Sequence, residues 1–468
     1  MDLHRLAVCA GMAMLGLSGA AYAAPSLAAR ACPSPELTQA GARCGVVEVR
    51  EDPAKPDRKI GLNVVIVPAL HPKPGEPPLF HLEGGPGIAA TTAALFYAGP
   101  GSTYRQSQDV VLVDQRGTGG SGPLHCAAIE NRSPLADELV ARDVIACRKE
   151  LSSQADLANY STVRTAEDVD SVREALHAEQ IDIWSISNGT RLAQQYIKAF
   201  PTRVRRAVMA GFVPLDYRTP LFHAMNAQRV VDLLIYKCRA DPVCSARYPN
   251  LEEEWTTVLA RLDHSPAHVQ WNGAPASLGR GRFTEEVRNS LSTAAGQRGF
   301  PALVHAAFGG DFGPFLHLLR KGSSPFAMGL YLTIACSEGG SRIPPADVQR
   351  YTEGTFLREY RVREELDACA EWPKYQPGSD FFQPPASSPE LLVVSGEMDH
   401  VAPPDYAEQF CSRLEHCHLV IIPDLGHGPF DLDLWSGGDC YDTMTVKFLE
   451  DGVVDASCVR KMRAPAFR

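Results

Sequence analysis

The sequence lacks the patterns of several protein classes. No two cysteines form a C-x-x-C pair, which argues against a metal site of the zinc-finger kind. The net charge of -10 is spread along the chain without a basic stripe, so we expect no nucleic-acid partner. There is no internal repeat and no long low-complexity tract, which excludes solenoids and propellers. Beyond the N-terminal segment, no apolar run approaches the ~18 residues of a membrane-spanning helix.

The composition is that of a globular protein. The chain has 468 residues, of which 45% are hydrophobic and 21% are charged, so it can bury a large core. This length exceeds one typical domain. We therefore expect either one large domain with an insertion or two domains, and the pattern described below favours the insertion.

The first 23 residues have the features of a cleavable leader. His4 and Arg5 precede an apolar stretch over residues 6–17, and the small-residue triplet Ala21-Tyr22-Ala23 follows. A membrane anchor is the alternative, but the apolar stretch is short for a bilayer. We predict a signal peptide over 1–23 and a mature protein that is periplasmic or secreted, without a membrane span. The oligomeric state is left open.

The cysteine count agrees with export. Of 13 cysteines, Cys9 lies in the leader, and the other 12 could form six bridges in an oxidising compartment. Spacing alone leaves their connectivity open. Neighbours along the chain suggest the pairs Cys32 with Cys44, Cys126 with Cys147, Cys238 with Cys244, Cys336 with Cys369, Cys411 with Cys417, and Cys440 with Cys458.

Short apolar segments alternate with helical patterns in two parts of the chain. The predicted strands, rich in β-branched residues, are 61–69, 78–82, 109–113, 181–184, 206–213, 391–394 and 419–422. This alternation predicts an α/β fold with a mostly parallel sheet and helices on both faces. The rhythm fails between 217 and 385. We expect a core formed by 24–216 and 386–468 and interrupted by a mostly helical cap over 217–385, with a separate domain as the alternative.

The segment Ser185-Ile186-Ser187-Asn188-Gly189 lies between a predicted strand and a predicted helix. A sharp turn at such a place exposes a serine hydroxyl at the top of a sheet and needs small neighbours. Ser187 is therefore the candidate nucleophile. The pentapeptide departs from G-x-S-x-G at its first position, and alone it would fit a plain serine-glycine loop equally well.

Two later segments complete a catalytic pattern. Asp399 follows the strand 391–394 and His427 follows the strand 419–422, in the order Ser, Asp, His that α/β-hydrolases use. Alone, Asp399 would be a capping residue and His427 a turn histidine. Together with Ser187 they predict a triad in which the imidazole takes the serine proton and the carboxylate orients the imidazole.

A glycine-rich segment predicts the site for the developing oxyanion. Residues 83–87, Glu-Gly-Gly-Pro-Gly, follow the strand 78–82, and glycine lets backbone N–H groups approach a substrate. We assign one donor to Gly85 and the second to the N–H of Asn188. A phosphate-binding loop is the rival interpretation, but no Gly-Lys-Ser/Thr follows. We therefore expect no cofactor.

These motifs resemble the proline iminopeptidase and tripeptidyl aminopeptidase group of α/β-hydrolases. The resemblance rests on residues 84–87 (GGPG), residues 114–119 (DQRGTG) with Ser121, the elbow at Ser187, and the two partners of Ser187. It implies a serine peptidase acting on peptides with a free N-terminus, under a helical cap. Glu83 stands where the iminopeptidases have histidine, which is closer to the tripeptidyl aminopeptidase branch.

An exopeptidase of this kind must bind a substrate ammonium, for which a buried carboxylate is the natural partner. Glu338, beside Cys336, is our candidate, and an ordinary surface glutamate is the alternative. Two other functions remain open. An esterase could use the same triad because this fold hosts many chemistries. A binding protein with a degenerate site is disfavoured by the intact Ser187, Asp399 and His427.

Overall fold

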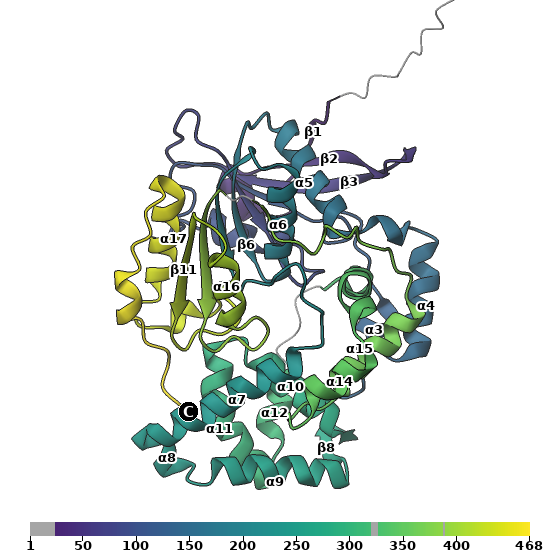
Figure 1. The fold of residues 1–468 in the computed structure, drawn as a ribbon, viewed down its shortest axis with the longest axis vertical. Helices are drawn as coiled ribbons and strands as arrows, with labels where there is room; N and C mark the ends of the chain where they lie inside the picture. The colour runs from purple at the N-terminus through teal and green to yellow at the C-terminus, as the bar shows by residue number, and fades with distance from the viewer. Residues whose placement is uncertain (1–23, 320–325, 387–388) are drawn as a thin grey trace, which may run out of the picture.

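The centre of the protein is a nine-stranded sheet (Figure 1), in a computed structural model that describes residues 24–319, 326–386 and 389–468. In sheet order the strands are β1 (Leu27–Arg30), β2 (Arg43–Asp52), β3 (Lys55–Val67), β5 (Val110–Val113), β4 (Leu79–Leu82), β6 (Ile181–Ile186), β7 (Val204–Ala210), β10 (Glu390–Gly396) and β11 (Cys417–Ile422). The pairs from β1 to β5 are antiparallel, and those from β5 to β11 are parallel. The predicted α/β class with a mostly parallel sheet is confirmed.

Two apolar cores lie on opposite faces of this sheet, because successive side chains of a strand point to opposite sides. In β10, Leu391 and Val393 belong to one core, while Leu392 and Val394 belong to the other. The first core is covered by α5 (Thr162–Ala175), α6 (Asn188–Ala199) and α16 (Pro404–Cys411). The second is covered by α1 (Pro35–Gln39), α2 (Ala94–Ala98) and α17 (Asp439–Asp451). Helices on both faces, as predicted, bury the central strands such as β4, β5 and β6.

A mostly helical region lies beyond one end of the sheet, in the lower half of Figure 1. Between β7 and β10 its elements are α7 (His223–Ala240), α8 (Pro242–Arg247), α9 (Leu251–His264), the hairpin β8 (Ala267–Trp271) and β9 (Ala274–Leu278), α10 (Arg280–Ser290), α11 (Ala294–Phe308), α12 (Gly313–Leu319), α13 (Met328–Ile334), α14 (Pro345–Thr352) and α15 (Tyr360–Glu371). A separate apolar core built around Trp255 and Phe283 holds α7 and α9 to α12 together.

Two helices from the first part of the chain join this region. The apolar side chains of α3 (Ala127–Glu130) and α4 (Ala141–Ser152) share a core with α13 and α15, and Figure 1 shows α3 and α4 beside α15. The helical layer therefore includes residues outside the predicted cap 217–385. The division of the chain into a core and a cap over 217–385 stays a prediction.

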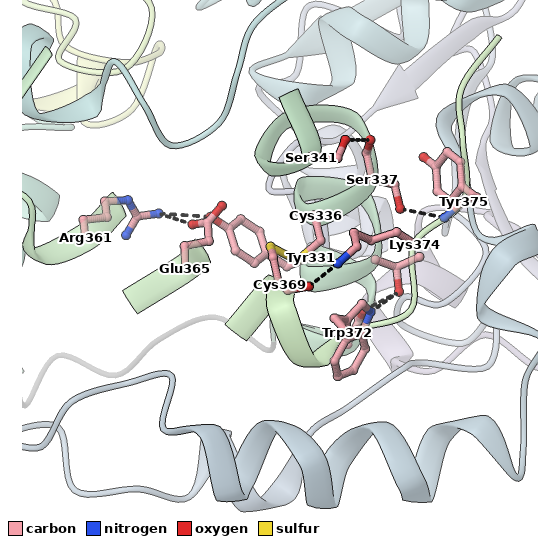
Figure 2. Close-up of a disulfide and its surroundings, with 12 residues drawn as sticks. Tyr331, Cys336, Ser337, Ser341, Arg361, Glu365, Cys369, Trp372, Lys374 and Tyr375 are labelled. Carbon is pink, nitrogen blue, oxygen red and sulfur yellow. Dashed lines mark hydrogen bonds and ion pairs between the residues drawn. A yellow bond between two sulfur atoms is a disulfide. The ribbon is translucent and has the colours of Figure 1, made fainter. Parts of the chain in front are cut away.

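Six disulfides cross-link the part of the chain that the structure describes. They join the neighbouring cysteines named above, from Cys32–Cys44 to Cys440–Cys458. Among them, Cys336–Cys369 closes the longest loop, with a sequence separation of 33, and ties the turn of π-helix after α13 (Ala335–Gly339) to α15. Figure 2 shows this disulfide between the two elements.

Two further expectations concern membranes and export. Within the described residues, no helix combines the length and the apolar character that crossing a bilayer demands. The predicted signal peptide, residues 1–23, lies outside the described residues.

Candidate active site

Ser187 occupies a strained turn between β6 and α6. Its backbone has φ 54° and ψ −125°, a conformation that residues with a side chain rarely adopt. The neighbours allow the turn. A Cβ on Gly189 would lie 2.1 Å from the carbonyl oxygen of Leu82, so only glycine fits there. Ser185 is fully buried and donates its hydroxyl to the Val208 carbonyl at 2.9 Å, which accounts for a polar residue where the motif usually has glycine.

A chain of hydrogen bonds connects the three residues predicted as a triad. The Nε2 atom of His427 lies 2.8 Å from the Oγ of Ser187. Its other ring nitrogen, Nδ1, lies 2.9 Å from both carboxylate oxygens of Asp399. Asp399 is fully buried and His427 is 9% exposed. Side chains separated by up to 240 positions therefore meet at the carboxyl ends of β6, β10 and β11.

The backbone holds Asp399 and His427 in place. The Oδ1 of Asp399 also accepts the N–H groups of Val401 and Ala402, both at 2.8 Å. The N–H of His427 donates to the carbonyl of Ser292, which precedes α11, at 3.1 Å. Arg229 of α7 donates to the Asp399 carbonyl at 2.8 Å. Residues of the helical region thus form hydrogen bonds with the loops that carry Asp399 and His427.

The glycine-rich loop after β4 packs directly against the serine turn. A Cβ on Gly84 would come within 2.9 Å of the Cβ of Ser187, so the loop can approach only without a side chain. Gly85 has φ +109°, which only glycine adopts freely. Asn188 is the first residue of α6, where backbone N–H groups have no acceptor within the helix. The two predicted donors, Gly85 and Asn188, both line the cavity described below.

Side chains of the segment 114–119 hold this loop and its surroundings in place through hydrogen bonds. The Gln115 side chain donates to the carbonyl of Glu83 at 2.7 Å. The buried Arg116 guanidinium binds both carboxylate oxygens of Asp168 on α5, at 2.6 and 2.7 Å. The buried carboxylate of Asp114 accepts the N–H groups of Thr91 and Gly120. These contacts shape the turn, and neither Asp114 nor Arg116 lines the cavity.

A cavity of ≈ 340 Å³ lies against Ser187 and His427. Its walls come from the loops at the end of the sheet and from the helical region. Its lining side chains include one carboxylate, Glu83. Burial raises the pKa of Glu83, but the adjacent His81 and the N–H of Gly84 together lower it by more than burial raises it. The pKa of Glu83 therefore falls below its ordinary value. Glu83 is therefore ionised at neutral pH.

The lining of the cavity also includes arginine and histidine side chains. Arg288 of α10 and Arg361 of α15 line the cavity, together with His223 and His400. Burial lowers the pKa of both histidines well below the ordinary value, and the charges of Arg361 and Arg288 lower it further. Both imidazoles are therefore neutral at pH 7. Sequence reasoning missed all four residues. His400 directly follows the predicted Asp399, whereas no motif surrounds Arg288, Arg361 or His223.

Glu338 lies elsewhere. It is fully buried and absent from the cavity lining. One carboxylate oxygen lies 3.1 Å from Nη2 of Arg191, and the other accepts the hydroxyl of Tyr375 and the N–H of Thr162. The predicted disulfide neighbour is present, but the carboxylate is already engaged by its own chain. A substrate ammonium would have to displace Arg191 to reach it.

No cluster of three or more histidine, cysteine, aspartate or glutamate side chains in the described residues is arranged to hold a metal ion.

The fold and the geometry of the site indicate a class of protein, and comparison with known proteins indicates the same class. Residues 77–434 match the family model described as the alpha/beta hydrolase fold. The chain therefore belongs to the α/β-hydrolase family.

Three relatives show which members it is similar to. The serine protease Hip1 of Mycobacterium tuberculosis is 30% identical over 192 residues, covering 37% of this chain and 36% of that protein. A tripeptidyl aminopeptidase of Streptomyces coelicolor is 30% identical over 193 residues, covering 36% and 35%. Carboxylesterase B of M. tuberculosis is 24% identical over 462 residues, covering 90% and 86%. The chain spans under two fifths of the length of the first curated relatives it matches.

Proposed function

We propose that the protein is a serine hydrolase in which Ser187 attacks an acyl carbon, His427 accepts its proton, and Asp399 holds the imidazole in the required tautomer. The observation that carries the proposal is the unbroken chain from Ser187 Oγ to His427 Nε2 and from His427 Nδ1 to Asp399. An imidazole oriented in this way can take the serine proton and return it to the leaving group. The acyl-enzyme that results is then hydrolysed by water through the same steps.

The N–H groups of Gly85 and Asn188 are proposed as the oxyanion donors. Their closeness supports this proposal, because a Cβ on Gly84 would lie 2.9 Å from the Cβ of Ser187 and 3.4 Å from the backbone nitrogen of Asn188. Such donors act on charge that develops only in the transition state, and losing one typically costs on the order of 100- to 1,000-fold in rate.

For the substrate, we propose the amide bonds of peptides with a free N-terminus. The names of two relatives, a serine protease and a tripeptidyl aminopeptidase, support this choice, as does the resemblance of residues 84–87 and 114–119 to that group. The ionised Glu83 at the cavity wall is a carboxylate that an ammonium could reach, unlike Glu338. Six disulfides support an oxidising, exported location.

Ester hydrolysis is the second candidate. The similarity to carboxylesterase B extends over 90% of this chain, and the same triad would cleave an ester. The cavity walls, rather than the triad, decide between an amide and an ester substrate.

The test uses the mature protein with chromogenic anilides of alanine and of tri-alanine, their N-acetylated forms, and p-nitrophenyl acetate. Ser187→Ala should abolish activity on every substrate that wild type cleaves. Cleavage of the unblocked anilides alone supports the peptidase, and a preference for the ester supports the alternative. Activity that survives in Ser187→Ala would contradict the proposed nucleophile.

A further inference from the structure

The charges that line the cavity are unevenly paired. Arg191 faces the carboxylate of Glu338 at 3.1 Å, and the carboxylate of Glu83 lies 2.9 Å from the Nε2 atom of His81. Arg288 and Arg361 share the carboxylate of Glu285, and Arg361 has a second carboxylate, that of Glu365, at 3.8 Å. Arg288 forms its one ion pair within the described residues with a carboxylate that also serves Arg361, so its charge is only partly balanced, provided that Glu285 is ionised.

Glu285 is ionised at any physiological pH. Burial raises the pKa of its carboxyl, but Arg288 and Arg361 lower it more strongly, to about 2. The neighbouring His223 and His400 are neutral, as described above. A buried positive charge that is only partly balanced is costly unless an anion accompanies it, since a low-dielectric site stabilises charges poorly.

Arg288 has unused hydrogen-bonding capacity. Its Nε and Nη2 donate to Glu285, and Nη2 also donates to the Asn289 side chain at 2.7 Å. Its Nη1 makes no hydrogen bond to any described residue, although the side chain is only 7% exposed and lines the cavity. The buried Nδ1 of His400 is also without a partner among the described residues. Polar groups in such a place favour a polar ligand.

Arg361 is held rigidly beside it. Its Nε donates to Nδ1 of His223 at 2.9 Å, and its Nη2 donates to the hydroxyl of Tyr331 at 3.1 Å. Figure 2 shows Arg361 and Glu365 next to Tyr331, close to the disulfide that ties α15 to the segment after α13. The guanidinium groups are therefore placed before a ligand arrives, which lowers the cost of binding one.

We propose that this cavity binds substrates through a carboxylate that pairs with Arg288, beside the hydrogen-bond chain of Ser187. The inference rests on the proposed hydrolase function and narrows its substrates to those with a carboxylate near the cleaved bond. Two sources supply that group in peptides: the C-terminal carboxylate of a short oligopeptide, or the side chain of a glutamate or aspartate. A guanidinium binds either through paired N–H donors.

The experiment compares pairs of unblocked peptides that differ only in charge. Tetra-alanine is compared with its C-terminal amide, and tetra-alanine amides with one glutamate are compared with the same peptides carrying glutamine, with the substituted position moved along the chain. Product formation is followed by mass spectrometry. We expect kcat/KM for at least one acidic peptide to exceed that of its neutral partner by about 10- to 100-fold, the range for a hydrogen bond to a charged group. The pair that discriminates identifies the source.

Arg288→Gln should reduce that ratio to below about 3, while Arg282→Gln serves as the matched control. Arg282 lies on the same helix, pairs with Glu286 at 3.1 Å and does not line the cavity, so its replacement should leave the ratio unchanged. Equal rates for every acidic and neutral pair in wild type would overturn the inference, as would a ratio that persists in Arg288→Gln.

If wild type cleaves none of these peptides, the proposed peptidase function fails, and binding still decides the inference. Calorimetric titration of Ser187→Ala with tri-alanine and tri-alanine amide then gives the two affinities. At least tenfold tighter binding of the acid, lost on adding Arg288→Gln, supports the carboxylate site. Equal affinities contradict it.

Discussion

Replacing Asp399 with asparagine tests the hydrogen-bond chain at its most constrained point. The Oδ1 of Asp399 accepts two backbone N–H groups at 2.8 Å, while the carboxylate also faces Nδ1 of His427 at 2.9 Å. An asparagine in this position must keep its oxygen toward the backbone donors, because its NH₂ group cannot accept hydrogen bonds from them. The NH₂ group is then directed at the imidazole of His427.

That arrangement reverses the tautomer of the histidine. Oδ1 also lies 2.9 Å from Nδ1, but an NH₂ group at the same distance would oppose a proton on Nδ1. We therefore expect Nδ1 to act as the acceptor, which places the ring proton on Nε2, 2.8 Å from the Oγ of Ser187. Nε2 can no longer accept the serine proton. The same change in a serine triad lowers kcat by about 10⁴, which corresponds to about 5.5 kcal/mol of activation free energy. We expect a loss of this order for Asp399→Asn.

The assay is the initial rate on the best chromogenic substrate, together with the thermal midpoint. Asp399→Asn should unfold close to the wild-type temperature because it keeps the shape and the backbone hydrogen bonds. Asp399→Ala leaves the N–H groups of the buried Ala402 and the partly buried Val401 without this acceptor. A buried unpaired N–H costs about 1–3 kcal/mol, so this variant should unfold at a clearly lower temperature. An asparagine variant that keeps more than a tenth of the wild-type rate would refute the reasoning.

Two further predictions concern the fold and the arginine pair. Gly189→Ala should give insoluble or unfolded protein, visible by circular dichroism, because its Cβ would lie 2.1 Å from the Leu82 carbonyl; a soluble, active variant would contradict the fixed turn. The pKa of Glu285 is about 2 when folded, against an ordinary 4.5, so its pairing stabilises the protein above pH 4.5 and is lost as pH falls toward 2. Denaturant titrations from pH 5 to 2 should show a loss of up to about 3 kcal/mol that is smaller in Glu285→Gln, and equal slopes would contradict the pairing.

The parallel part of the sheet could be predicted because its strands are buried on both faces. Segments such as 109–113 and 391–394 are continuous apolar runs, and the structure has strands at Val110–Val113 and Glu390–Gly396. The antiparallel edge of the sheet was harder to predict from the sequence. β2 reads RCGVVEVRED, where charged residues alternate with valine, and its pairing with β3 follows from contacts that no local pattern records.

At the site, the local signals come from positions where the backbone conformation demands a particular residue. Gly85 and Gly189 follow strand ends, and their tight turns require glycine, while Ser187 lies in the turn that Gly189 allows. Glu338 was chosen for a neighbouring cysteine, which says nothing about the direction of its side chain. Arg288 lies in an ordinary helix, and only the fold brings it to the cavity.

The helical layer does more than cover the strand ends. Its Arg229 donates to the backbone carbonyls of Glu397 and Asp399, and the carbonyl of its Ser292 accepts the N–H of His427. A Cβ on Gly426 would lie 2.2 Å from that same carbonyl, so the loop and the helical region are in direct contact. A movement of α7 or α10 would therefore shift the acid and the base relative to Ser187, which belongs to the sheet. Because α10 also carries Arg288, we expect a ligand bound to Arg288 to affect how Ser187, His427 and Asp399 are aligned.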